Sequence, residues 1–199
     1  MLQVLKQWQT RYSYFWDHLN VLRAGILGAN DGIISVSGIV LGAVGADLSN
    51  TTLLISGISG MVAGACSMAG GEYVSVSAQR DVQLQKLQLQ AVADHQVIDL
   101  TQTKIQKRDV LNPLHAAGMS MVSFMFGALI PLLAISLSSP SWRLINTVLA
   151  MMIALSLNAT VSAGHAAVPV RKVILRNILV GVATALITYV MGTLLGGQV

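Results

Sequence analysis

The stretch MVAGACSMAGGEYVSVSAQRD, residues 61–81, contains the only glutamate of the chain within an apolar, glycine-rich segment. An α-helix turns by about 100° per residue, so a helical segment places two methionines, the glutamate and two polar residues within a stripe roughly 60° wide. These residues are Met61, Met68, Glu72, Ser75 and Gln79. Two thioethers and a carboxylate on one helix face are candidate metal ligands.

A neighbouring strip of the same segment carries Gly57, Gly64 and Gly71. Small residues on one face of a membrane helix let a second helix approach to backbone distance. We therefore expect this strip to pack closely, and we expect the candidate ligands to point toward a partner helix and not toward lipid.

The composition around this segment is that of an integral membrane protein. Hydrophobic residues make up 54% of the 199 residues and charged residues 10%, against roughly 25% charged in a soluble domain. Five nearly charge-free runs are each close to the ~20 residues that cross a bilayer as a helix. They lie at 22–44, 53–77, 115–137, 144–164 and 173–195. The predicted fold is one all-α transmembrane domain, residues 1–199, with five spans.

Two segments are expected to lie outside the bilayer core. The helical spacing of leucine and aromatic residues predicts an amphipathic helix at residues 1–20, lying in the membrane interface as an anchor. Residues 82–112 are polar and predict a short cytoplasmic connection that begins as an extension of the second helix.

The basic residues predict the orientation of the chain. They precede the first span and lie between the second and third and between the fourth and fifth, whereas the opposite side has only Arg143. By the positive-inside rule the N-terminus is cytoplasmic and the C-terminus is outside. The net charge of +4 then reflects topology and contact with anionic lipid, without nucleic acid as a partner. The first residues lack a signal-peptide pattern, so we expect no removable signal and, by default, a bacterial plasma membrane.

The first span contains a second candidate ligand, Asp31. A carboxylate at this depth costs about 2.5–3.5 kcal/mol to insert and is retained mainly where it faces a cavity, a partner or an ion. Gly28 and Ser35 fall on the same helix face. In the alternative interpretation, Asn30, Asp31 and Gly32 mark a helix break in which Asp31 caps freed backbone amides.

Counting residues from the membrane ends places Asp31 and Met68 at a similar depth, with Glu72 about one turn nearer the cytoplasm. Carboxylate oxygens together with a thioether suit a divalent first-row metal better than sodium or calcium. The sequence therefore predicts a metal site of these three residues. Further pore-lining candidates are Met61, Asn30, Ser35 and Ser75, and the close-packing glycines are Gly28, Gly32, Gly57, Gly64 and Gly71.

Single residues outside the candidate metal site give further predictions. Asn112 and Pro113 predict the N-cap and first residue of the third span, which Pro131 is expected to bend or break. Cys66 should face away from Met68 and act as a packing residue. No nucleophile, base and orienting group occur together, so we expect no enzyme and no resident cofactor. Three histidines are left without a role: His95, His115 and His165.

Three segments carry a resemblance to a known family. They are GILGANDGIISVSGIVLGAVGA at 25–46, GMVAGACSMAGGEYVSVSAQRD at 60–81 and NPLHAAGMSMVSFMFGALIPLL at 112–133. Together with the five-span pattern, they resemble the vacuolar iron transporter (VIT) family. The pattern is most similar to the short nodulin-like and bacterial branch, which lacks the cytoplasmic metal-binding domain.

The resemblance implies a homodimer whose metal path runs between the first two spans of each subunit and exports Fe²⁺ or Mn²⁺ from the cytoplasm in exchange for protons. The pore aspartate and methionine of the family fall on Asp31 and Met68. Many members have a glutamate where this chain has Gly60, whereas Glu72 matches the bacterial and nodulin-like sequences. The connection at 82–112 contains no glutamate, so we expect transport without a metal-collecting domain.

A two-fold axis along the pore would bring two copies of Asp31, Met68 and Glu72 around one path. Four crowded carboxylates cannot all stay ionised without a cation, so metal and protons should compete for them. Two alternatives stay open at this point. One is a channel or a transporter of another substrate on the same scaffold, and the other is a non-transporting membrane protein in which Asp31 serves helix packing.

Overall fold

The computed structural model describes residues 2–93, 111–164 and 169–196, and the side chains in these ranges except those of 2–18, 87 and 90–93. The described chain is helical throughout, apart from short connections. The elements are α1 (Leu2–Gly45), α2 (Asn50–Ala93), α3 (Pro113–Leu137), the short 3₁₀ helix η1 (Pro140–Trp142), α4 (Arg143–Gly164) and α5 (Val170–Gly196). The predicted all-α fold is thus confirmed.

Five of these helices are long and apolar enough to cross a membrane, as the sequence predicted. The apolar stretches begin and end at Leu19–Gly45, Asn50–Lys86, Pro113–Leu137, Pro140–Gly164 and Val170–Gly196. The predicted interfacial helix and the first span are parts of one uninterrupted helix, α1, and the interfacial placement stays a prediction. Helix α2 continues past residue 77 to Ala93, and His95 lies outside the described residues.

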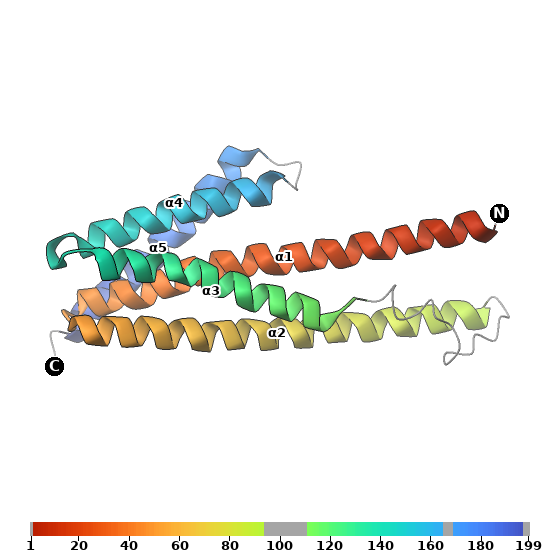
Figure 1. Cartoon of the computed structure of the whole chain (residues 1–199), viewed down its shortest axis with the longest axis horizontal. Coiled ribbons are helices and arrows are strands. Elements are labelled where there is room, and N and C mark those ends of the chain that lie inside the picture. The colour runs from red at the N-terminus through yellow and green to blue at the C-terminus, as the bar shows by residue number, and fades with distance from the viewer. Residues whose placement is uncertain (1, 94–110, 165–168, 197–199) are drawn as a thin grey trace.

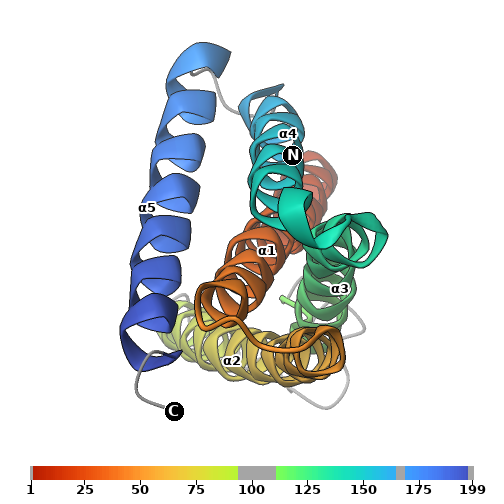
Figure 2. The same ribbon diagram turned by 90° about the vertical axis from the view of Figure 1, so that its left-hand side faces the viewer.

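Helix α1 lies at the centre of the bundle, with α2, α3, α4 and α5 arranged around it (Figure 2). Its most apolar stretch is 56% buried, against 11% for that of α5. One side of α1 contributes Val36 and Val40 to an apolar cluster with Phe124 of α3. Another side contributes Leu41 to a cluster with Leu155 of α4. The first cluster also contains residues of α2, and the second also contains a residue of α5. Helix α1 therefore packs in a shared core with each of the other four long helices.

A tight turn reverses the chain between α1 and α2. Asp47 adopts the left-handed backbone conformation, with φ of 53°, and the Leu48 amide donates to the Ala43 carbonyl over 3.1 Å. This is the pattern of a helix that ends with a left-handed residue. The Ser49 hydroxyl then accepts from the Thr52 amide over 3.3 Å and caps α2. Helix α2 therefore returns antiparallel beside α1 (Figure 1).

The start of α3 follows the sequence prediction. Asn112 is the N-cap and its side chain accepts a hydrogen bond of 3.1 Å from the Leu114 amide, with Pro113 as the first helical residue. Helix α3 runs through Pro131 as one element, so it is not broken there, and the alternative prediction of a bend stays a prediction. Buried side chains on both sides of the proline, Ala128 and Leu132, pack in the cluster shared with α1 and α2, and this packing holds the helix together.

Two glycines of α1 allow the backbones of α1 and α3 to approach each other closely. A Cβ added at Gly28 would meet the backbone carbonyl of Ser120, and one added at Gly32 would meet that of Phe124. Backbone atoms cannot rotate away as a side chain can, so these two positions accept only glycine at this helix separation. The close partner of these two glycines is therefore α3, whereas a Cβ at Gly45, further along α1, would meet the backbone of α5.

The glycines of α2 fall into two groups. A Cβ at Gly57 would meet Leu132, and one at Gly64 would meet the ring of Phe124, so both positions pack against side chains of α3. Nothing lies within 4 Å of a Cβ built at Gly71. This differs from the expected close packing, because Gly71 lies on a face of α2 that the described part of the subunit leaves exposed.

Candidate functional site

Asp31 lies inside the uninterrupted helix α1, so the alternative of a helix break at residues 30–32 is wrong. Its side chain is half-buried and accepts a hydrogen bond of 2.7 Å from the Ser35 hydroxyl, one turn further along α1. Within the described ranges no other hydrogen bond or ion pair reaches this carboxylate. One turn earlier on the same face, Leu27 is 46% exposed. The subunit thus leaves the face of Asp31 partly open.

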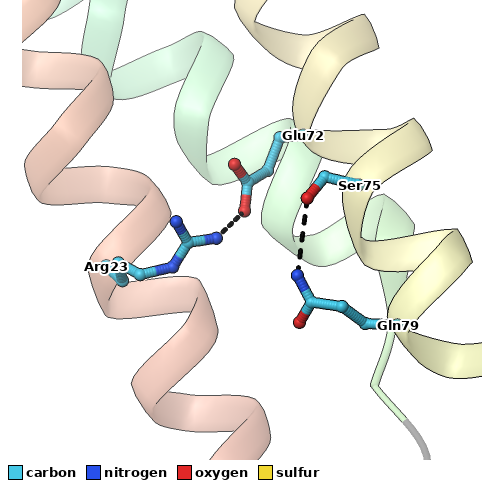
Figure 3. Close-up of polar contacts among 4 residues, drawn as sticks. All are labelled: Arg23, Glu72, Ser75 and Gln79. Carbon is cyan, nitrogen blue, oxygen red and sulfur yellow. Dashed lines mark hydrogen bonds and ion pairs between the residues drawn. The ribbon is translucent and has the colours of Figure 1, made fainter. Parts of the chain in front are cut away.

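Glu72 of α2 is buried, with 8% of its surface exposed, and its carboxylate has a partner. The Arg23 guanidinium of α1 donates to its Oε1 over 2.7 Å (Figure 3). The arginine side chain is about half exposed. A fixed cation therefore already balances this carboxylate, and a metal ion that binds Glu72 must compete with Arg23.

The sequence interpretation missed Arg23 as a partner of Glu72, because 49 residues separate the two. The positions of the two residues in the apolar runs could have indicated this pairing. Arg23 is the second residue of the first apolar run, and Glu72 lies near the end of the second run, which returns through the membrane. The same comparison of depths that relates Asp31 to Met68 brings Arg23 and Glu72 toward the same side of the bilayer.

The predicted methionines pack on the core of the subunit. Met61 and Met68 are partly buried and lie against the apolar cluster formed by α1, α2 and α3, as does Met125 of α3. Cys66 is exposed, so it faces away from the cluster that Met68 contacts, as its helical position predicted. The described residues do not cover its side chain, so they do not give it the expected packing role.

The remaining candidates occupy different surroundings. Ser75 and Gln79 are exposed on α2 and hydrogen-bond to each other over 3.4 Å (Figure 3). Asn30 lines a cavity between α1, α4 and α5. Near it, the Asn158 amide of α4 donates to the Ile26 carbonyl over 3.2 Å and links α4 to α1.

The described residues of one subunit do not assemble a metal site from the usual ligands. Nowhere in them do three or more His, Cys, Asp or Glu side chains gather closely enough to hold an ion. Asp31 and Glu72 are each bonded to a different partner. In the described part of the chain, the predicted ligands are therefore separate donors along α1 and α2.

The ion pair leads to a testable prediction about stability. Replacing Arg23 with Gln leaves a buried carboxylate unpaired, which we expect to cost about 1–3 kcal/mol and to lower the melting temperature in detergent. Glu72→Gln should cost less, because the half-exposed Arg23 stays solvated. The double variant should recover part of the loss of Arg23→Gln. A double variant no more stable than Arg23→Gln would show that the pair does not stabilise the fold.

The chain is similar in sequence to a known family and to several known proteins. A family model described as the VIT family matches residues 22–98 and 89–193. A vacuolar iron transporter homologue of Arabidopsis thaliana (homolog 2) is 32% identical over 176 residues, covering 88% of this chain and 84% of the relative. Homolog 3 of the same plant is 36% identical over 179 residues, covering 89% and 84%. The VIT-like transporter 1b of Glycine max is 35% identical over 179 residues, covering 89% and 77%.

Proposed function

Because the chain belongs to the VIT family, we propose that it moves Fe²⁺ or Mn²⁺ out of the cytoplasm in exchange for protons. The family places it among metal transporters of the membrane, and the five long apolar helices agree with this. The metal, the direction and the coupling to protons are our proposal. We assign the path to α1 and α2, with Asp31, Met68 and Glu72 as the residues that the metal meets.

The observation that carries this proposal is the register of α1 against α2. A Cβ at Gly60 of α2 would meet the side chain of Ile39 of α1, so these residues lie at the same height. The helices are antiparallel, and the same number of residues separates Ile39 from Asp31 as separates Gly60 from Met68. At 1.5 Å per residue, Asp31 and Met68 therefore lie at about the same height.

Glu72 lies one helical turn beyond Met68 toward the end where α1 begins. Since Arg23 pairs with it there, we assign Glu72 to the cytoplasmic entrance of the path. An incoming metal ion would displace the Arg23 guanidinium from Glu72 and then reach Asp31. The Met68 thioether would turn from the apolar cluster to complete the ligand set, which a flexible methionine side chain allows.

We further propose that the protein is a homodimer with α2 at the interface. Small residues recur on one exposed face of α2, at Ser59, Ala63, Ser67 and Gly70. Such a face favours close packing of membrane helices. A second copy packed there would bring a second set of donors toward the path, which supplies the ligands that the described part of one subunit does not gather.

Exchange for protons follows from the chemistry of the donors. Paired copies of Asp31 would put two carboxylates on one narrow path, and a metal ion that displaces Arg23 would add the two Glu72 carboxylates, so that either metal or protons must neutralise them. We also propose that the N-terminus is cytoplasmic, because most basic residues flank the spans at the end where α1 begins and only Arg143 lies at the opposite end. A bacterial plasma membrane remains our proposal for the location, whereas the relatives from plants are named vacuolar.

The test is metal uptake into liposomes that contain the purified protein. We expect Fe²⁺ and Mn²⁺ to enter several-fold faster when the interior is acidic, because outward proton movement drives inward metal movement. Protein-free liposomes with the same pH gradient are the control. Uptake that ignores the gradient would indicate a channel, and absence of uptake of either metal would favour a non-transporting role.

A further inference from the structure

A cavity of about 400 Å³ lies between α1, α4 and α5, apart from the proposed metal path. Neither Asp31 nor the α2 ligands line it. Its polar lining combines two arginines, three asparagines and a serine: Arg23, Asn30, Asn158, Ser162, Arg176 and Asn177. The apolar remainder comes from leucine and isoleucine side chains of α1 within residues 19–27.

The charge of this lining selects an anion. Two guanidinium groups and no carboxylate line the cavity, which disfavours any metal cation there. Arg23 already donates one nitrogen to Glu72. Arg176 of α5 is exposed, and the structure shows no ion pair for it among residues 2–93, 111–164 and 169–196. Arginine is suited to phosphate because its planar fork offers several donors at once.

A second observation points to a ligand with its own donor. The Asn30 side-chain oxygen is buried, and no donor among the described residues reaches it. This oxygen is not open to the cavity as the side chain stands, but Asn30 lines the cavity, so rotation of its amide would bring the unpaired acceptor to a bound hydroxyl group and recover the free energy of that hydrogen bond. The cavity therefore offers arginine donors for an anion and an acceptor for a neighbouring hydroxyl.

The position of the cavity favours a lipid over a soluble anion. It lies at the end of the bundle where α4 finishes and α5 begins, at the edge of the membrane-crossing stretches. Outward-facing side chains of the surrounding helices are apolar and exposed, including Leu157, Leu175 and Leu179. Basic pockets between membrane helices at this level bind anionic lipid headgroups.

We propose that this cavity binds the headgroup of an anionic glycerophospholipid. The phosphate lies between Arg176 and Arg23, the headgroup hydroxyl donates to Asn30, and the start of an acyl chain packs on the apolar side chains of α1. This site does not depend on which metal is carried. It places a lipid phosphate beside the same arginine that holds Glu72.

The experiment measures the thermal stability of the full chain in detergent with added phosphatidylglycerol, phosphatidylcholine or inorganic phosphate. We expect phosphatidylglycerol alone to raise the melting temperature of the wild type. Arg176→Gln should weaken the apparent lipid affinity at least about tenfold, since a charge-assisted phosphate contact is worth more than 1.4 kcal/mol. Arg176→Lys should recover part of it.

Arg171→Gln is the matched control, because Arg171 is an exposed arginine of α5 that does not line the cavity. This variant should respond to phosphatidylglycerol as the wild type does. Equal losses in the two glutamine variants would overturn the proposal in favour of general surface attraction. An equal response to phosphatidylcholine would overturn headgroup selectivity, and an equal response to inorganic phosphate would overturn a lipid ligand.

Discussion

Asp31→Asn should reduce Fe²⁺ and Mn²⁺ uptake into liposomes at least about tenfold, with the protein still folded. The substitution removes the carboxylate charge at the height of Met68 but keeps an oxygen that can accept the Ser35 hydrogen bond seen in the structure. A neutral amide oxygen is a much weaker ligand for a divalent metal than a carboxylate. Size-exclusion chromatography and the melting temperature would verify that the fold is retained.

Asp47→Asn is the matched control for this change. Asp47 is exposed in the turn between α1 and α2 and has a left-handed backbone conformation, which asparagine tolerates well. This variant should transport at the wild-type rate. Uptake by Asp31→Asn equal to that of Asp47→Asn would remove Asp31 from the metal path.

Met68 can be tested in the same assay with a different control. Met68→Ala removes a proposed ligand but also a side chain packed on the apolar cluster. Met125→Ala removes a methionine from the same cluster on α3, away from the proposed path. A larger loss of transport in Met68→Ala than in Met125→Ala would separate the ligand role from packing.

Gly32→Ala should strongly destabilise the protein. The new Cβ would meet the Phe124 carbonyl and crowd the Ala128 amide, both of which belong to the α3 backbone. Forcing extra volume into a packed site costs about 1–3 kcal/mol, occasionally more, and here no side-chain rotation can relieve it. We expect a large drop in melting temperature and in the yield of monodisperse protein.

Gly71→Ala makes the same chemical change where nothing lies within 4 Å of the added atom. Alanine is about 1 kcal/mol more favourable than glycine inside a helix, so this variant should be as stable as the wild type or slightly more stable. If Gly32→Ala were as stable as Gly71→Ala, the close approach of α1 and α3 would be wrong. Loss of dimer in Gly71→Ala alone would instead support an interface on the exposed face of α2.

The number and type of helices followed from the sequence, because charge-free runs of this length have one stable form in a bilayer. The Asn112 cap and the opposite faces of Cys66 and Met68 were also predictable. They depend on residues close together in the chain and on helical geometry alone. The sequence thereby determined the candidate ligands and their order along α1 and α2.

Only the tertiary structure decided which groups meet. It paired Glu72 with Arg23 across 49 residues, packed Gly28 and Gly32 of α1 against α3, and left Gly71 open. It also gathered two arginines from α1 and α5 around one cavity. Such partners depend on the rotation and tilt of whole helices, which are set by the summed packing of many side chains and not by any local pattern. The sequence alone thus indicated that Glu72 faces another helix and not lipid. The packing of whole helices was needed to identify Arg23 as its cationic partner.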